Sequence, residues 1–421
     1  MYMSLDYIDI ILIVAKIIIA AILLILAAAY MTFIERKVVA WIQVRVGPTR
    51  CGPAGILQPI ADAVKLMLKE DIIPSNVDRF IWGIAPIITV VIAITAFSII
   101  PLGDPFTVAG RSISLGLSNV NVGVLVFLAL SSIGVYGVFL AGWGSNSRYS
   151  LFGGMRAGAQ MISYELVMAL SVVTVCLWAD SMNLSDIVKS QMNTDPADPV
   201  KYIMIIPHVI ALGLFTIALF AETNRAPFDL PECENELVAG FHTEYSGLRF
   251  AMFYLGEYVN IIVGSALLVT LFLGGWMFPF GLSETLQSDT PAWGSILSIL
   301  WFILIFGILF LVVLWIRAEL PVPDDTCKSP FACRFGLPFA LGLVFMIVLS
   351  FTRNFPAWIP LVGLLWFVFK LALVLFVFMW VRATLPRFRY DQLMSFGWKF
   401  LFPVALGNLV LMVIVKLLVN G

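Results

Sequence analysis

Residues 1–33 read MYMSLDYIDIILIVAKIIIAAILLILAAAYMTF, an apolar run that contains a single basic residue, Lys16. A helix needs about 20 apolar residues to cross a bilayer, whereas a signal peptide has a shorter apolar run preceded by basic residues. Here the basic pair Arg36-Lys37 follows the run instead. We therefore predict a retained first membrane-spanning helix with its N-terminus outside.

The rest of the chain has the same character. Hydrophobic residues make up 61% of the 421 residues, and charged residues make up 12%, against about 25% in soluble domains. So few charges could not cover a water-soluble surface. The 25 basic and 26 acidic residues nearly balance, so nothing indicates nucleic-acid binding. The composition predicts an all-α, polytopic transmembrane helix bundle that forms one membrane domain over residues 1–421.

Ten segments are apolar enough to be spans, although the eighth is short. Open sheet edges cannot face lipid, so each span is predicted to be a helix. The ten lie at 8–33, 80–101, 121–141, 160–179, 203–221, 250–276, 293–316, 336–352, 357–382 and 398–418.

Lys and Arg are distributed unevenly between the connections. One set of connections holds 18 of the 25 basic residues, and the opposite set holds 4. Basic residues favour the cytoplasmic side of a membrane. The first set is therefore predicted to face the cytoplasm or its organellar equivalent, with both termini outside. That set comprises 34–79, 142–159, 222–249, 317–335 and 382–399.

One inner connection is strongly acidic. Residues 221–247, AETNRAPFDLPECENELVAGFHTEYSG, carry one arginine and six carboxylates: Glu222, Asp229, Glu232, Glu234, Glu236 and Glu244. Pro231 and Gly240 have the positions that begin and end a short helix. A solvated acidic face is the usual fate of such a run. The Gly, Pro and aromatic residues that flank it favour a packed, structured site.

Among the charged residues within the predicted spans, Glu165, Glu257 and Lys370 are the most informative. A charge at mid-membrane costs about 2.5–3.5 kcal/mol on insertion scales. The two glutamates either lie near an interface beside water and tyrosine, or belong to a chain of titratable groups that begins at the acidic loop. We prefer the chain. Lys370 lies at mid-span, so we expect a buried carboxylate or water as its partner, and a role in proton movement.

Residues typical of bound cofactors are missing. Five scattered cysteines form no CxxC pair, and the two histidines are predicted on opposite sides of the membrane. No nucleotide-binding glycine motif is present. We therefore expect no redox centre and no covalently bound or metal-ligated cofactor on this chain.

The first inner connection contains GILQPIADAVKLMLKED, residues 55–71. Its apolar residues recur at helical spacing on one side, with polar residues opposite, which predicts an interfacial amphipathic helix. Two roles stay open for this helix: a structural anchor, or a lid over a lipid-soluble ligand.

Residues 35–74, 120–165, 221–247 and 380–403 closely resemble the family of H-type membrane subunits, also numbered subunit 1, of respiratory complex I, the proton-pumping NADH:quinone oxidoreductase. The similar stretches include AETNRAPFDLPE (221–232) and RFRYDQLM (387–394). The resemblance implies a membrane subunit that forms part of the quinone chamber at the junction with the peripheral arm. It also implies the first acidic segment of a proton path towards antiporter-like subunits.

The same resemblance implies quinone as substrate, with NADH, FMN and iron–sulfur clusters on partner subunits. It places the chain in the bacterial inner membrane rather than the mitochondrial one. The residues expected in proton coupling are Glu165, Asp229, Glu232, Glu234, Glu236, Glu244 and Glu257, together with Lys370. Those expected along the quinone route are Arg36, Asp62, Phe241 and Arg382.

The chain departs from the family, which usually has eight spans. Segment 295–321 matches segment 360–386 at nine of 27 positions, and both end in WxRAxLP. We infer an inserted helix pair at about 293–352, which is a partial duplication or a chance similarity. Two other functions stay open: a membrane anchor of a related hydrogenase or ferredoxin-linked complex, and a stand-alone proton-coupled transporter, which would show two similar halves.

Overall fold

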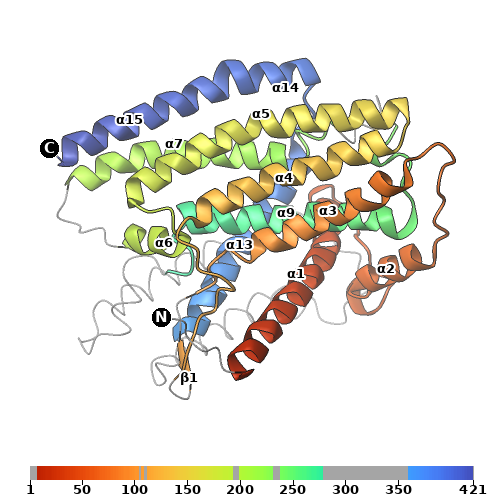
Figure 1. The fold of residues 1–421 in the computed structure, drawn as a ribbon, viewed down its shortest axis with the longest axis horizontal. Helices are drawn as coiled ribbons and strands as arrows, with labels where there is room; N and C mark the ends of the chain where they lie inside the picture. Colours follow the sequence, from red (N-terminus) through yellow and green to blue (C-terminus); the bar gives the residue numbers. More distant parts are fainter. Residues whose placement is uncertain are drawn as a thin grey trace.

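A computed structural model of the chain describes residues 7–103, 106–108, 111–192, 199–230, 238–277 and 359–420. Within these residues, eight helices are long and apolar enough to cross a membrane, which confirms the predicted polytopic helix bundle (Figure 1). The inserted pair expected at 293–352, with its two spans, lies outside the described residues, as do Glu232, Glu234 and Glu236.

The long helices are α1 (Tyr7–Ile42), α3 (Arg79–Phe97), α4 (Gly123–Gly144), α5 (Arg148–Ala179), α7 (Pro199–Glu222), α9 (Gly247–Phe272), α13 (Ile359–Thr384) and α15 (Phe402–Asn420). A π-helical turn, Gly397–Leu401, joins α14 (Tyr390–Phe396) to α15. Shorter elements lie in the connections: a 3₁₀ turn (Pro53–Gly55), α2 (Gln58–Leu68), α6 (Leu184–Met192) and a second 3₁₀ turn, η2 (Gly240–His242).

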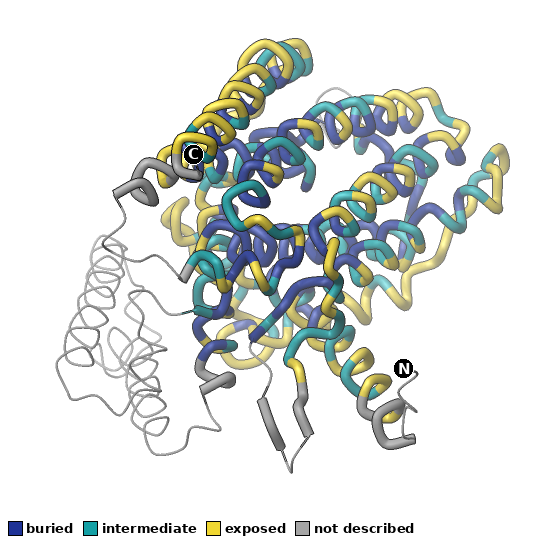
Figure 2. The backbone as a smooth tube through the Cα atoms, turned by 60° about the vertical axis from the view of Figure 1, so that its left-hand side comes forward, coloured by how far each residue is buried: buried dark blue, intermediate teal, exposed yellow. Residues whose placement is uncertain are grey.

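Helix α9 forms the centre of the bundle. In its most apolar stretch 83% of the residues are buried, compared with 17% in α1. Helices α3, α1 and α13 pack against α9, and α1 and α13 run steeply across the other spans in Figure 1. Exposed residues follow the outer helices, as Figure 2 shows for α15. Any polar group on the inner face of α9 must therefore find its partner on a neighbouring helix.

The described residues contain one small sheet. Strands β1 (Phe106–Val108) and β2 (Arg111–Ile113) form an antiparallel hairpin in the connection between α3 and α4. Because the hairpin lies in a connection, the spans themselves remain helical. The predicted amphipathic helix corresponds to α2, whose apolar residues Ile60, Val64 and Leu68 are exposed.

The predicted inner connection 142–159 was too long, and the predicted span at 160–179 too short. Helix α5 begins at Arg148, and only residues 145–147 separate it from α4. A Cβ atom on Gly142 would lie 2.5 Å from the Ser150 carbonyl oxygen, so glycines here allow the two helices to touch. Glu165 consequently lies roughly 25 Å from the start of α5, near its middle.

Helix α5 also touches η2, which lies within the connection between α7 and α9. A Cβ atom on Gly153 would lie 2.7 Å from the Phe241 amide nitrogen and 2.8 Å from Gly240 backbone atoms. Main-chain atoms cannot rotate away as a flexible side chain can. The absence of a side chain at Gly153 therefore permits η2 to lie directly on α5.

Gly153→Ala should destabilise the protein by about 1–3 kcal/mol, because η2 must move away from α5. The matched control is Gly213→Ala in α7, where an added Cβ meets nothing within 4 Å. Thermal unfolding of the purified complex should show a lower midpoint for Gly153→Ala and no loss for Gly213→Ala. Equal midpoints for the two variants would contradict the close approach.

Candidate functional site

Arg225 is the centre of a buried ion-pair network at the acidic end, our name for the end of the bundle where residues 221–230 and 238–247 lie. Its Nε atom lies 2.5 Å from Oε1 of Glu257 on α9, and its Nη1 atom lies 3.4 Å from Oε1 of Glu35 on α1. The guanidinium also lies over the ring of Tyr258, 4.4 Å from the centroid. Arg225 follows α7 by three residues, so this one side chain connects three spans.

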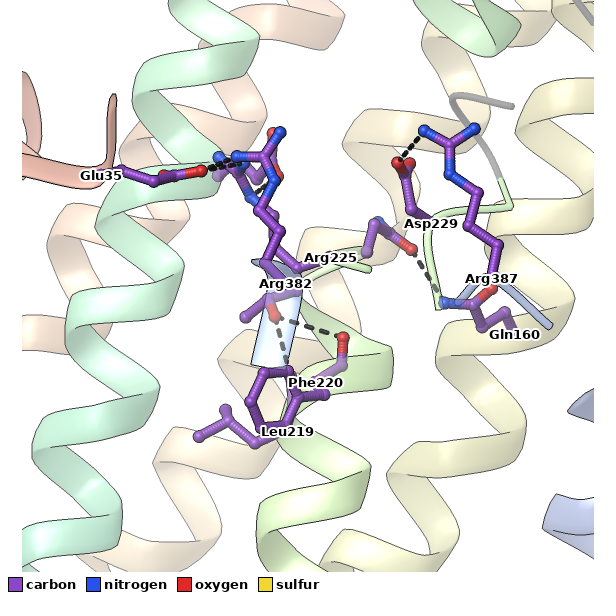
Figure 3. A network of polar contacts seen from close by, with 11 residues as sticks. Glu35, Gln160, Leu219, Phe220, Arg225, Asp229, Arg382 and Arg387 are labelled. Atoms are coloured by element: carbon purple, nitrogen blue, oxygen red, sulfur yellow. Dashed lines mark hydrogen bonds and ion pairs between the residues drawn. The ribbon is translucent and has the colours of Figure 1, made fainter. Parts of the chain in front are cut away.

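Glu35 is shared between two arginines. It forms a second ion pair with Arg382 on α13 (Figure 3). Glu35 is buried, and a buried carboxylate is stabilised only when it is well paired. Two glutamates and two arginines thus form a charge-balanced group that joins α1, α9, α13 and the end of α7.

A further ion pair holds the acidic stretch to the segment after α13. Arg387 donates to the buried Asp229, with 3.0 Å between Nη2 and Oδ2. The Phe388 amide donates to the Pro227 carbonyl at 3.2 Å. Asp229 is therefore attached to the connection between α13 and α14, beside the network and separate from Glu35.

Gln160 of α5 holds the segment between Glu222 and Asp229 from the other side. Its Nε2 atom donates to the carbonyls of Ala221 and Phe228, both at 2.8 Å, and lies 3.3 Å from Oδ1 of Asn224. Gln160 is fully buried, and Figure 3 shows one of its contacts. One neutral side chain therefore closes the loop that presents Arg225 to the network.

Glu165 and Glu222 lie together deeper in the bundle. The Ser132 hydroxyl of α4 donates to Glu165, and the Ser131 hydroxyl lies 3.5 Å from the same carboxylate oxygen. Ser131 also bonds Glu222, which is close enough to Glu165 for the two carboxylates to repel each other. The two acids, from α5 and α7, thus share Ser131 of α4.

Two small cavities connect these acids to the ion-pair network. The first, about 40 Å³, is lined by Glu257, Phe241 and Tyr254, and the second, about 30 Å³, is lined by Ser131. Glu222 and Asn260 line both cavities. A water molecule needs about 10–15 Å³, so each cavity has room for about two. A line of polar groups and water-sized spaces therefore runs from Glu257 through Glu222 to Ser131 and Glu165.

The predicted pair Arg36 and Asp62 meets outside the buried network. Arg36 Nη1 lies 2.8 Å from Asp62 Oδ2, and Lys65 Nζ lies 3.8 Å from Asp62 Oδ1. The side chain of Arg36 is 55% exposed, whereas that of its neighbour Glu35 is only 7% exposed. The end of α1 therefore directs one charge into the bundle and the next charge towards α2.

Of the other predicted residues, some lie beside the first cavity and others lie elsewhere in the chain. Phe241 is buried and lines the first cavity, and Glu244 is half-buried just beyond η2. Lys370 lies away from the acids, because it donates to main-chain carbonyls at the opposite end of α9 instead of to the expected carboxylate or water. Glu232, Glu234 and Glu236 lie outside the described residues.

His242 is buried among the rings of Phe241, Phe250 and Tyr254. Burial lowers its pKa to about 4, because the charged imidazolium would lose its hydration. At neutral pH this side chain is therefore uncharged, and the charge of the acidic end is carried by carboxylates and arginines. Within the described parts of the chain, no group of three or more His, Cys, Asp or Glu side chains could hold a metal ion.

Three members of the site were missing from the predicted set: Glu35, Glu222 and Arg225. Arg225 is the one cation of the acidic stretch, which was a usable signal. Glu35 was hidden in a basic cluster beside Arg36, and Glu222 at the end of a span. A carboxylate at the inner boundary of a span is the pattern that could have identified both.

Comparisons with known proteins identify the family of the chain. A family model described as NADH dehydrogenase matches residues 15–345 and 329–413. An H-type subunit of the NADH-quinone oxidoreductase of Solibacter usitatus is 46% identical over 386 residues, which cover 90% of each chain. The H-type subunits of Protochlamydia amoebophila and Paramagnetospirillum magneticum are 43% and 39% identical, over 91% and 95% of this chain and 91% and 90% of theirs.

These matches extend over most of the chain and include α1, α9 and α13, which carry the ion-pair network. The chain therefore belongs to the H-type subunit family of NADH-quinone oxidoreductase, as a multi-pass membrane subunit of respiratory complex I.

Proposed function

We propose that this chain forms part of the quinone chamber of complex I, where the membrane arm joins the peripheral arm, and the first acidic segment of the proton-coupling path. The observation that carries the proposal is the line from Glu257 to Glu222 to Glu165: the two cavities lead from Glu257 past Glu222 to Ser131, which lies beside Glu165. Acids from three separate helices converge there inside an apolar bundle. Such groups are costly in a membrane and mark proton relays and substrate pathways.

Protons would move along this line through the carboxylates, the serine hydroxyls and water in the two cavities. The Ser131 hydroxyl lies within reach of both Glu165 and Glu222, and Asn260 lines both cavities. Proton transfer needs hydrogen-bonded groups within reach of each other, directly or through one water. In this proposal Glu232, Glu234, Glu236 and Glu244 extend the path at the acidic end, which faces the cytoplasm in a bacterial inner membrane.

The quinone side of the proposal rests on α1, α2, α13 and η2. Arg36, Asp62, Phe241 and Arg382 would line the route of the quinone head group, which partner subunits carrying FMN and iron–sulfur clusters reduce. Reduction to quinol consumes two protons. The acids beside Phe241 are the chain's own groups positioned to respond to that demand.

The ion-pair network offers a physical link between the two processes. Glu35 contacts both Arg382 and Arg225, and Arg225 contacts Glu257. A negative charge that arrives beside Arg382 would weaken its attraction for Glu35. Glu35 would then bind Arg225 more strongly, and the field at Glu257 would change. Events in the chamber would thus alter the proton affinity of the first acid of the line.

Glu222→Gln tests the proton path. The amide keeps the shape of the side chain but cannot carry a proton between the two cavities, so quinone reduction coupled to proton pumping should fall about tenfold or more. NADH:quinone reductase activity and pumping would be measured in membrane vesicles with normal complex content. Asp186→Asn, which removes a carboxylate from α6, serves as the control. Full turnover and pumping in Glu222→Gln would remove this residue from the path.

A photoreactive quinone analogue tests the chamber. Illumination should label this chain on peptides that contain Phe241 or Arg382, and excess unmodified quinone should prevent the labelling. Arg382→Met should lower kcat/KM for quinone about tenfold, because Arg382 lines the route and pairs with Glu35. NADH oxidation by an artificial acceptor at the peripheral arm is the control activity. Labelling confined to other subunits would rule the chamber role out.

A further inference from the structure

Lys370 lies in a cage of main-chain oxygens. Its Nζ atom lies 2.6 Å from the Leu273 carbonyl, 2.9 Å from the Gly275 carbonyl and 2.8 Å from the Met277 carbonyl. Gly274 and Gly275 have φ angles of 71° and 51°, which a glycine adopts readily. The chain after α9 thereby turns back, and its carbonyls converge on one ammonium group.

These carbonyls directly follow α9, whose own last carbonyls have no partner within the helix. Gln191 of α6 donates to the Thr270 and Leu271 carbonyls at 3.3 and 2.7 Å. Lys370 of α13 serves the carbonyls that follow. Side chains from two other elements therefore complete the C-terminal end of the central helix.

The geometry suits a permanent charge. An ammonium group has three donors, and the three carbonyls use all of them. The C-terminus of a helix carries a partial negative charge, which favours a cation. A lysine that gave up its proton would lose a donor to a carbonyl that has turned towards it. The cage thus explains how a lysine is tolerated at mid-span, and it differs from the proton-transfer role predicted from depth alone.

Helices α9 and α13 are connected at two levels. One is the Lys370 cage at the end of α9. The other is the ion-pair network, where Arg382 of α13 reaches Glu257 of α9 through Glu35 and Arg225. Lys370 and Arg382 are twelve residues apart on one helix, which is about 18 Å. A displacement of α13 by one helical turn, about 5.4 Å, would remove Arg382 from Glu35.

We propose that Lys370 is a positioning residue that sets the axial position of α13 against α9, so that Arg382 meets Glu35. The consequence for turnover rests on the quinone-route role proposed above for Arg382. The contact itself does not depend on that role, so the two can be tested separately.

Disulfide cross-linking between two introduced cysteines measures the position of α13 against the segment after α9, independently of enzyme activity. A Cβ atom on Gly363 of α13 would lie 3.6 Å from Cβ of Trp276, within the range of a disulfide. Gly363→Cys combined with Trp276→Cys should cross-link efficiently in the assembled complex under mild oxidation. Adding Lys370→Met should lower the cross-linking yield severalfold. An unchanged yield would overturn the proposal.

Lys416 supplies a matched control. It lies on α15 and donates to the Leu177 carbonyl and to Asp180 at the end of α5, so it has the same chemistry on a different helix pair. Lys416→Met should leave both the cross-linking yield and the quinone kinetics within about twofold of the parent, because α15 packs mainly against α5 and α7, and distant sites act independently.

A double-mutant cycle connects Lys370 to Arg382. Lys370→Met should lower kcat/KM for quinone about tenfold, because small misplacements of a positioned group are costly. Lys370→Met combined with Arg382→Met should be no worse than Arg382→Met alone, although residues this far apart normally have additive effects. Lys370→Arg, which retains a charged donor but cannot release a proton at working pH, should recover most of the loss.

Multiplicative losses in the double variant, or Lys370→Arg as inactive as Lys370→Met in assembled complex, would overturn the positioning role, because Lys370 would then act independently of Arg382. If Arg382→Met has normal kinetics while Lys370→Met still lowers the cross-linking yield, the quinone-route proposal fails and the positioning role stands.

Discussion

A buried charge in an apolar bundle must have an opposite charge beside it, and Arg225 imposes that requirement on this fold. Its guanidinium needs carboxylates, and among the described residues Glu35 of α1 and Glu257 of α9 supply them. Glu35 pairs with Arg225 and also with Arg382, which brings α13 to the same place. Removing one partner from such a group leaves an uncompensated charge, which typically costs about 3–5 kcal/mol. The acidic end can therefore assemble only when all four segments arrive together.

Much of this arrangement can be predicted from local sequence. Apolar runs of sufficient length predicted the eight spans that the structure describes. Glu165 and Glu257 were recognisable because a carboxylate inside such a run is energetically costly and is usually functional. The start of α5 was not recognisable. Its segment rich in glycine reads as a loop, yet those glycines are used for contact with α4 and with η2. Close helix packing and loop formation use the same residue, and only the neighbouring helix decides between them.

The contact partners of the charged residues were harder to predict than the positions of those residues in the spans. The depth of Lys370 in its span indicated that it must have a partner, but main-chain carbonyls have no signature in sequence. These carbonyls belong to the segment that follows α9, 93–97 residues away. Glu35 and Glu222 lie at span boundaries, where a charge is ordinary. Their importance comes from Arg225 and from the serines of α4, which are contacts between distant segments.

Gln160 holds the segment between Glu222 and Asp229 with an uncharged amide. The residue that supports this backbone is therefore not one of the residues that titrate. Salt screens ion pairs and protonation abolishes them, but neither changes the hydrogen bonds from an amide to the Ala221 and Phe228 carbonyls. The backbone around Glu222 and Arg225 is thus fastened by bonds that are indifferent to pH and ionic strength. Charges on this segment can change during a working cycle while the scaffold that carries them keeps its shape.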